Sequence, residues 1–136
     1  MKIYTSYFGN AKKLGSAGVK MVSISLYKPK FFYGIEAKNV APRSYMIFGG
    51  LSQEEYRKKY REEVLGRVNA EEFIKMLERM SQGSDVALCC YEKPGDFCHR
   101  HILAEWLKEE TGQIIEEFGV EPEKDNKPEA QQLSLF

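Results

Sequence analysis

The sequence predicts an α/β protein, with a small, mostly parallel sheet and helices on both faces in a Rossmann-like, three-layer arrangement. Its strand-like segments are nearly continuous apolar runs, which is typical of parallel strands that are covered on both faces. Segments with helical periodicity separate these runs along the chain. After residue 118 the sequence becomes polar and charged, with two prolines and no core periodicity until its last residues. We therefore expect an α/β domain at residues 1–118 and a disordered tail at 119–136.

Four segments have the composition of β-strands. The first, KIYTSYF, is rich in β-branched and aromatic residues, and the second, VKMVSISL, is mostly apolar. The third, VALCCY, is apolar enough for a buried strand, and QIIEEF follows the glycine that ends the last helix. The expected strands therefore lie at residues 2–8, 19–26, 86–91 and 113–118.

Capping residues mark where the helices begin. Ser52 and Glu55 form a capping box, in which each side chain accepts from the other residue's backbone N–H group. The stretch from Asn69 to Glu72 gives a second such signal, before apolar residues that recur at helical spacing. Asp96 can cap the last helix. Beyond a single turn at 11–14, we expect helices at 53–65, 70–82 and 97–111.

Residues 27–50 show no clear periodicity, and a segment of this kind is often a functional loop or lid. Two interpretations of its many aromatic residues remain open. In one, they pack over the edge of the sheet, which we favour for Phe31, Phe32 and Phe48. In the other, tyrosines and basic side chains stack on and neutralise a nucleotide or a single strand. The residues suited to that role are Tyr27, Tyr33, Tyr45, Lys28, Lys30, Lys38 and Arg43.

The composition limits the partners of the chain. Its 136 residues, 43% of them apolar, suffice for one domain with a real core. Twenty basic and twenty acidic residues cancel, so phosphate binding must be local rather than due to a global field. No apolar run approaches the roughly 20 residues of a membrane span, and no signal peptide is visible. Three cysteines, an odd count, favour reduced thiols in a cytoplasmic protein without a membrane partner.

The stretch from Asp85 to Lys108 organises the rest of the chain, as a strand, a short Pro-Gly turn and a helix. Cys98-His99-Arg100-His101 falls in the first helical turn, where free N–H groups and the helix dipole favour negative charge. Basic side chains do not stabilise that end of a helix, so they indicate a bound anion. The carboxyl ends of neighbouring parallel strands would bring further residues to this pocket. The predicted anion-binding residues are Cys98, His99, Arg100, His101, Ser6, Tyr7, Tyr27 and Tyr91.

The same turn allows three other interpretations. Cys98 beside a guanidinium could be a nucleophile with a lowered pKa, and Glu92 with His99 could be an acid–base pair. Glu92 could equally be the ion-pair partner of Arg100. We expect no metal or other cofactor; the alternative is a metal at Cys98, His99 and His101, with Cys90 as a further ligand. Finally, the cysteines could be buried apolar residues, and the turn purely structural.

The stretch CCYEKPGDFCHRHILAEWL resembles the signature of the domain of unknown function 488 family. That signature is an apolar strand ending in Cys-x-Glu, a short loop, then Cys-His-Arg and a helix. The opening KIYTSYF is similar to the family's first strand, with Thr5 near its end, so the resemblance covers residues 2–118. It implies a small α/β domain whose Cys-His-Arg turn faces a pocket, and no particular reaction. The family commonly has Asp-x-Arg at the end of strand two, and this chain has Ser23-Ile24-Ser25 there. The charge of that arginine is therefore missing or comes from Lys28, Lys30 or Arg43.

The last five residues resemble the bacterial sliding-clamp-binding peptide, Gln-Leu-Ser/Asp-Leu-Phe, at every position; they are Gln132, Leu133, Ser134, Leu135 and Phe136. On a flexible tail, the apolar side chains would anchor in a hydrophobic pocket, and the glutamine would add directional hydrogen bonds. The alternative is that these residues fold back onto the chain's own sheet.

These observations favour an accessory protein of DNA metabolism, which binds an anion or nucleotide at the Cys98-His99-Arg100 turn and is tethered to the bacterial sliding clamp. Its ligand would be a phosphate-bearing small molecule or nucleic acid. One alternative is a small hydrolase or transferase that acts on a phosphorylated substrate through Cys98, or through Glu92 and His99. The other is a non-catalytic interaction module.

Overall fold

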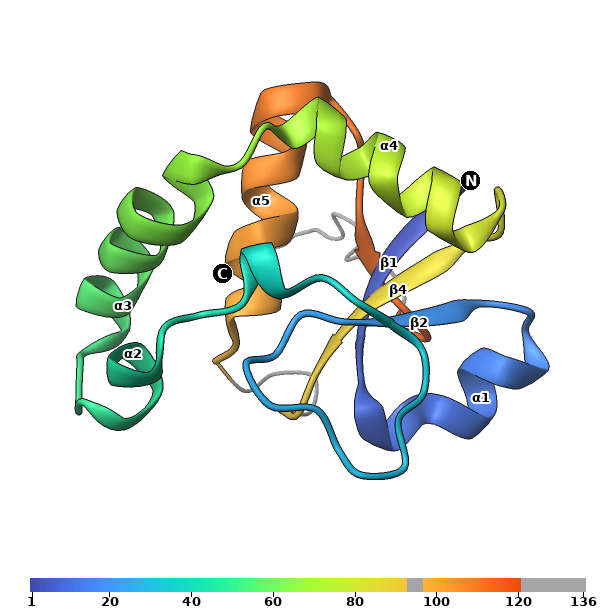
Figure 1. The fold of residues 1–136 in the computed structure, drawn as a ribbon, viewed down its shortest axis with the longest axis horizontal. Helices are drawn as coiled ribbons and strands as arrows, with labels where there is room; N and C mark the ends of the chain where they lie inside the picture. The colour runs from blue at the N-terminus through green and yellow to red at the C-terminus, as the bar shows by residue number, and fades with distance from the viewer. Residues whose placement is uncertain (93–96, 121–136) are drawn as a thin grey trace, which may run out of the picture.

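The computed structural model of the chain describes residues 1–92 and 97–120, and it contains an all-parallel sheet (Figure 1). Within the described residues five strands pair in the order β3-β2-β4-β1-β5. They are β1 (Ile3–Tyr7), β2 (Lys20–Ser23), β3 (Ile35–Glu36), β4 (Val86–Cys90) and β5 (Glu116–Glu117). The predicted parallel α/β class is confirmed.

Two helices, α3 (Gln53–Lys59) and α4 (Ala70–Ser81), begin where the capping signals at Ser52 and Asn69 predict. The other α-helices of the described residues are α1 (Ala11–Ser16), α2 (Ser44–Phe48) and α5 (His99–Thr111). The capping box of Ser52 and Glu55 is present in both directions, and Asn69 accepts from the backbone N–H of Glu72. A π-helical turn (Tyr60–Val64) and a 3₁₀ turn (Leu65–Arg67) continue α3 toward α4. Two more 3₁₀ turns lie at Phe8–Asn10 and Lys38–Val40.

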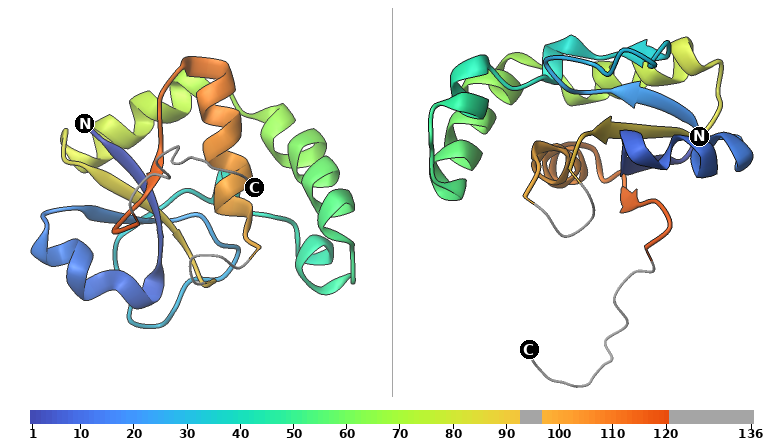
Figure 2. Two further views of the ribbon diagram at one scale, coloured as in Figure 1. Left: turned by 180° about the vertical axis from the view of Figure 1, so that it is seen from behind. Right: turned by 90° about the horizontal axis from the view of Figure 1, so that it is seen from below.

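Alternation along β4 divides the core between the two faces of the sheet. Val86, Leu88 and Cys90 belong to the larger apolar cluster, with residues of α4 and α5 such as Leu77 and Leu103. Ala87 and Cys89 point to the other face and join a smaller cluster with Phe8, Leu14 and Phe32. Figure 2 shows α1 and α4 on different sides of the strands. Helices therefore cover both faces, and β4 is buried along its whole length.

The end of β2 and the start of α5 differ from the boundaries expected from the sequence. The second strand ends at Ser23 rather than Leu26, because the carbonyl of Ile24 accepts from His99 instead of from a neighbouring strand. The last helix begins at His99 with Cys98 as its N-cap, whose sulfur accepts from the backbone N–H of Arg100. Asp96, the expected cap, lies outside the described residues.

Residues 27–50, expected to be an irregular loop, contain β3, a 3₁₀ turn and α2. Tyr60 holds this segment in place, since its buried hydroxyl donates to the carbonyl of Val40 at 2.6 Å. Gly119 and Val120 belong to a turn after β5, and the rest of the expected tail, 121–136, lies outside the described residues. None of the helices in the described ranges is long and apolar enough to cross a bilayer.

The buried Tyr60 hydroxyl predicts an effect of Tyr60→Phe on stability. The substitution leaves the Val40 carbonyl without its donor, so we expect the free energy of unfolding to fall by about 1–3 kcal/mol in urea denaturation. Tyr45→Phe is the matched control, because the Tyr45 hydroxyl donates to Glu63 at the exposed surface and its loss should change stability little. Equal effects of the two substitutions would contradict this role of Tyr60.

Candidate functional site

A cavity of about 540 Å³ opens at the carboxyl ends of β2 and β4. Parallel α/β sheets bind ligands at this edge. The ends of the two strands and the first turn of α5 form its inner wall, and α2 with the start of α3 forms its outer wall. The inner wall consists of Ser25, Leu26, Tyr27, Tyr91, Glu92, Phe97, Cys98 and His99. The outer wall consists of Pro42, Met46, Ile47, Phe48, Leu51, Gln53 and Tyr56.

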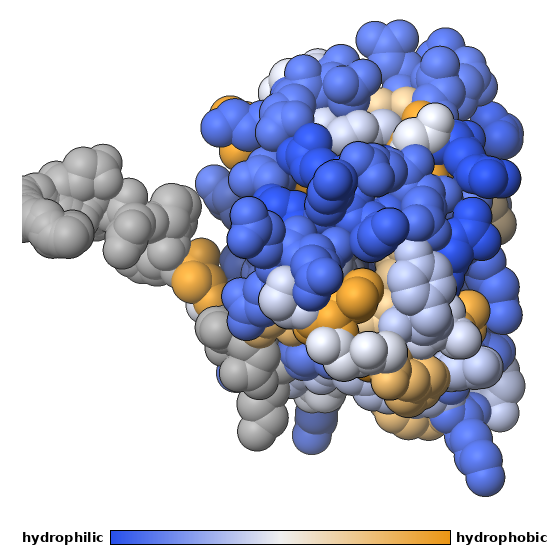
Figure 3. All heavy atoms as spheres, turned by 90° about the vertical axis from the view of Figure 1, so that its left-hand side faces the viewer, coloured by the Kyte–Doolittle hydropathy of each residue, from blue (hydrophilic) through white to orange (hydrophobic). Residues whose placement is uncertain are grey.

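Aromatic side chains on the cavity wall remain open to solvent. Tyr27 is 63% exposed, Phe48 73% and Tyr91 51%, although large apolar groups of this kind are usually covered. Figure 3 faces α2 and α3, and apolar side chains gather on the lower part of this face, toward α2. The upper part of the same face is hydrophilic. The cavity thus presents exposed, flat aromatic rings next to a hydrophilic part of the protein surface.

Two polar groups lie among these aromatic rings. Glu92 is exposed and lines the cavity, and its carboxylate lies close enough to affect Tyr56. Burial, and to a lesser extent the Glu92 charge, raises the pKa of Tyr56. The Tyr56 phenol is therefore protonated at neutral pH, so the cavity holds both a hydrogen-bond donor and an anionic acceptor.

His99 is buried, although its side chain lines the cavity. Its Nε2 lies 2.7 Å from the carbonyl oxygen of Ile24, which can only accept, so Nε2 carries the proton. Burial, and to a lesser extent the nearby Arg100 charge, lowers the pKa of His99 to about 4, so the imidazole is neutral. Nδ1 faces the sulfur of Cys98 at 3.8 Å. The ring therefore presents an unprotonated nitrogen toward the cysteines.

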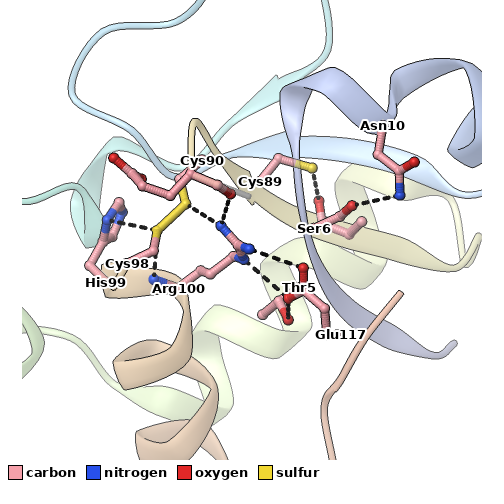
Figure 4. A network of polar contacts seen from close by, with 11 residues as sticks. Thr5, Ser6, Asn10, Cys89, Cys90, Cys98, His99, Arg100 and Glu117 are labelled. Carbon is pink, nitrogen blue, oxygen red and sulfur yellow. Dashed lines mark hydrogen bonds and ion pairs between the residues drawn. A yellow bond between two sulfur atoms is a disulfide. The ribbon is translucent and has the colours of Figure 1, made fainter. Parts of the chain in front are cut away.

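Arg100 is completely buried and is held by groups of the protein itself (Figure 4). Its Nε and Nη2 donate to the two carboxylate oxygens of Glu117, at 3.1 and 3.0 Å. Nη1 donates to the backbone carbonyl of Glu92 at 2.6 Å and to the sulfur of Cys90 at 2.9 Å. The interpretation of Glu92 as its ion-pair partner is wrong, because β5 brings Glu117 beside β1 and into that position.

Cys90 and Cys98 form a disulfide in the structure. The expectation of reduced thiols is therefore wrong for these two residues, and holds for Cys89, which is free and buried. Arg100 contacts both bonded sulfurs, because its Nη1 donates to the Cys90 sulfur and its backbone N–H donates to the Cys98 sulfur. In this oxidised form Cys98 has no thiol, so a role as nucleophile requires reduction.

The structure brings together five of the predicted site residues on the cavity wall: Tyr27, Tyr91, Glu92, Cys98 and His99. Four others lie elsewhere. Ser6 is buried and accepts from the side chain of Asn10, and Tyr7 ends β1 outside the cavity wall. Arg100 lies behind the wall. His101 lies with Thr5 and Glu117 around a separate hollow, and burial lowers its pKa.

The aromatic and basic residues of the 27–50 segment follow neither of the two interpretations completely. Phe32 packs in the smaller core cluster, as expected, whereas Phe48 is exposed on the cavity wall instead of packing over the sheet. Among the basic residues, Lys28 and Lys38 pair with Glu36, and Arg43 pairs with Glu63. Tyr33 and Phe31 line another hollow.

Sequence reasoning missed most of the outer wall, which includes Met46, Ile47 and Tyr56. The apolar run YMIF was a usable signal for part of this wall. It was missed because it forms a short helix, too short to show helical periodicity. Among the described residues, one group of three has ligand atoms close enough for a metal ion, and it consists of Cys90, Cys98 and His99, within 4.8 Å of one another. Of the four ligands that the metal alternative named, His101 is the one that lies outside this group.

The amino-acid sequence matches the model of a known protein family. Residues 19–111 match the family model DUF488-N3a, described as the active DUF488-N3 subclade. The chain belongs to the domain of unknown function 488 family. The match includes the strand end, the turn and the Cys-His-Arg helix start that form the inner wall of the cavity. No curated protein and no solved structure matches the chain significantly.

The Arg100–Glu117 pair predicts a large effect of Glu117→Gln. The substitution leaves a fully buried guanidinium without its carboxylate, so we expect the free energy of unfolding to fall by about 3–5 kcal/mol. Glu105→Gln is the control, because that carboxylate pairs with Arg57 and Arg61 at the surface and should contribute less than about 1 kcal/mol. Urea denaturation of both variants checks the difference, and similar losses would refute it.

Proposed function

We propose that the chain is a cytoplasmic accessory protein of DNA metabolism, whose cavity binds the base of a nucleotide or of nucleic acid. In the same proposal, residues 132–136 tether it to the bacterial sliding clamp. The observation that supports it most is the aromatic cavity at the carboxyl edge of the sheet, lined by Tyr27, Phe48 and Tyr91.

Stacking is the interaction that such a cavity favours. Each nucleobase has a flat π-face, and stacking on an aromatic side chain contributes about 1–3 kcal/mol per base. The Glu92 carboxylate and the Tyr56 hydroxyl line the same cavity from its inner and outer walls, where they can accept from and donate to the edge of a base. A cavity of about 540 Å³ falls within the range of ligand sites for small molecules.

The geometry shifts the expected recognition from the phosphate to the base. Arg100, the main predicted anion-binding residue, donates to Glu117, Cys90 and Glu92 rather than into the cavity. Any phosphate would therefore lie at the mouth of the cavity, with the sugar. This arrangement suits an exposed base in a nucleic acid as well as a free nucleotide.

The tether is proposed from the five-residue peptide match alone. Residues 121–131 connect it to the described domain, and eleven extended residues span at most about 35–40 Å. Attachment to a clamp raises the local concentration of a weakly binding domain near DNA. The net charge of zero fits this mechanism, because the domain needs no strong attraction to DNA of its own.

A second candidate is an enzyme that acts on the bound base or nucleotide. It is favoured by the position of Glu92, Cys98 and His99 on one wall, and by the family model's description as an active subclade. Glu92 is the carboxylate placed to act as a general base, and Cys98 as nucleophile requires the reduced state. Formation of a product during nucleotide titrations would favour this candidate over simple binding.

The cavity predicts a specific effect of Phe48→Ser. We expect deoxynucleosides and their monophosphates to bind with similar affinity in calorimetric titration, and this substitution to weaken both by about 5- to 100-fold. Tyr33→Ser is the matched control, since Tyr33 is 90% exposed and does not line the cavity. If inorganic phosphate competes fully, or if Phe48→Ser has no effect, the proposal of base recognition fails.

The peptide predicts binding to purified bacterial sliding clamp. The intact chain should bind, and the double substitution Leu135→Ala with Phe136→Ala should weaken binding at least about tenfold, because it removes two apolar anchors. Gln131→Ala, one residue before the peptide, should leave the affinity unchanged. Surface plasmon resonance on immobilised clamp measures all three, and equal affinities would reject the tether.

A further inference from the structure

We infer that Cys90, Cys98 and His99, once the disulfide is reduced, bind a divalent zinc-like ion with an open fourth position toward the cavity. Cys98 and His99 line that cavity, so a group bound there would meet the ion directly. This inference concerns the metal content of the chain and does not depend on nucleotide or clamp binding.

The three side chains already converge. Their ligand atoms lie within 4.8 Å of one another, and Cys90, Cys98 and His99 are only 1%, 3% and 6% exposed. Nδ1 of His99 lies 3.8 Å from the sulfur of Cys98. In a tetrahedral zinc site, a sulfur at about 2.3 Å and a nitrogen at about 2.05 Å from the ion lie about 3.6 Å apart. The Cys98–His99 spacing therefore needs little change to hold zinc.

The orientation of His99 gives a second, independent argument. Because Nε2–H donates to the carbonyl of Ile24, the lone pair of Nδ1 points toward the cysteine sulfurs. With Cys98 in a disulfide, the Nδ1–sulfur contact contains no hydrogen, so a buried acceptor faces a group that cannot donate. Metal-binding histidines are commonly fixed in this way, by a hydrogen bond from the second nitrogen to a backbone carbonyl.

The surroundings suit a dithiolate as well. Nη1 of Arg100 donates to the Cys90 sulfur at 2.9 Å, and its backbone N–H donates to the Cys98 sulfur at 3.5 Å. Such donors stabilise metal-bound thiolates. Two thiolates balance a divalent ion, and Glu117 balances Arg100, so the loaded site would add no net charge to the interior.

Reduction of the Cys90–Cys98 disulfide precedes metal binding. A dithiol reductant transfers two electrons and two protons, the bond between the Cys90 and Cys98 sulfurs breaks, and two thiols form while the reductant becomes a disulfide. Binding of the ion then replaces the two thiol protons, which pass to solvent as two sulfur–metal bonds form. Two thiolates and one imidazole favour zinc over magnesium or calcium, which prefer oxygen ligands.

Metal binding by the full-length chain tests the inference. The protein is reduced with a dithiol without oxygen, the reductant is removed, and Zn²⁺ or Co²⁺ is added in excess and then dialysed away. We expect about one ion per chain by elemental analysis, and a thiolate-to-cobalt charge-transfer band in the near ultraviolet. The same wild-type chain with the disulfide intact should hold at least about tenfold less metal, which is a comparison that needs no substitution.

Cysteine variants locate the site. Cys90→Ser, Cys98→Ser and His99→Gln should each lower the affinity for Co²⁺ at least about tenfold, with circular dichroism used to select variants that fold. Cys89→Ser is the matched control, because Cys89 adjoins Cys90 in sequence but packs on the other face of the sheet. Less than about one-tenth of an ion per reduced wild-type chain overturns the inference. A cobalt spectrum without the charge-transfer band, or metal loss in Cys89→Ser alone, overturns it as well.

Discussion

The buried ion pair between Arg100 and Glu117 determines how the parts of this domain fit together. A guanidinium without solvent requires a carboxylate and further acceptors, and here they come from β5, from the end of β4 and from the turn after it. Thr5 of β1 joins the same network by donating to Glu117 at 2.6 Å. Buried pairs of this kind add little net stability compared with apolar side chains, but they restrict which arrangement of strands is acceptable. Here the restriction fixes a very short edge strand beside β1 and the start of α5 beside β4.

The same network separates two environments that the sequence places side by side. Arg100 and His101 point away from the cavity, toward β1 and β5, whereas Cys98 and His99 face it. The cavity wall is therefore largely apolar and aromatic, although the segment that forms it is rich in basic residues. Its chemistry depends on Glu92, Tyr56 and the sulfur–imidazole group, and the positive charge lies behind the wall where Glu117 neutralises it.

Local patterns predicted most of the elements, because each depends on residues that are close in sequence. The capping box of Ser52 and Glu55 and the cap at Asn69 give the starts of α3 and α4 correctly. The partner of Arg100 could not be predicted in this way, since Glu117 is seventeen residues away and reaches it only through pairing of β5 with β1. The boundary of β2 and the outer wall of the cavity depend on tertiary contacts in the same way, through His99 and through α2. The two imidazoles and the guanidinium at the start of α5 indicated an important position, but their charges alone did not reveal which way each side chain points.

Adjacent cysteines at 89 and 90 have a consequence for the chemistry of the oxidised protein. Consecutive residues of a strand point to opposite sides, so Cys89 lies with the smaller cluster while Cys90 bonds to Cys98. Disulfide exchange requires a thiolate that can approach one of the bonded sulfurs. Burial raises the pKa of Cys89 to about 12, and the backbone of β4 lies between its thiol and the bond. Isomerisation to a Cys89–Cys98 disulfide would therefore require the sheet to open. The fold thus protects the Cys90–Cys98 pairing kinetically against exchange.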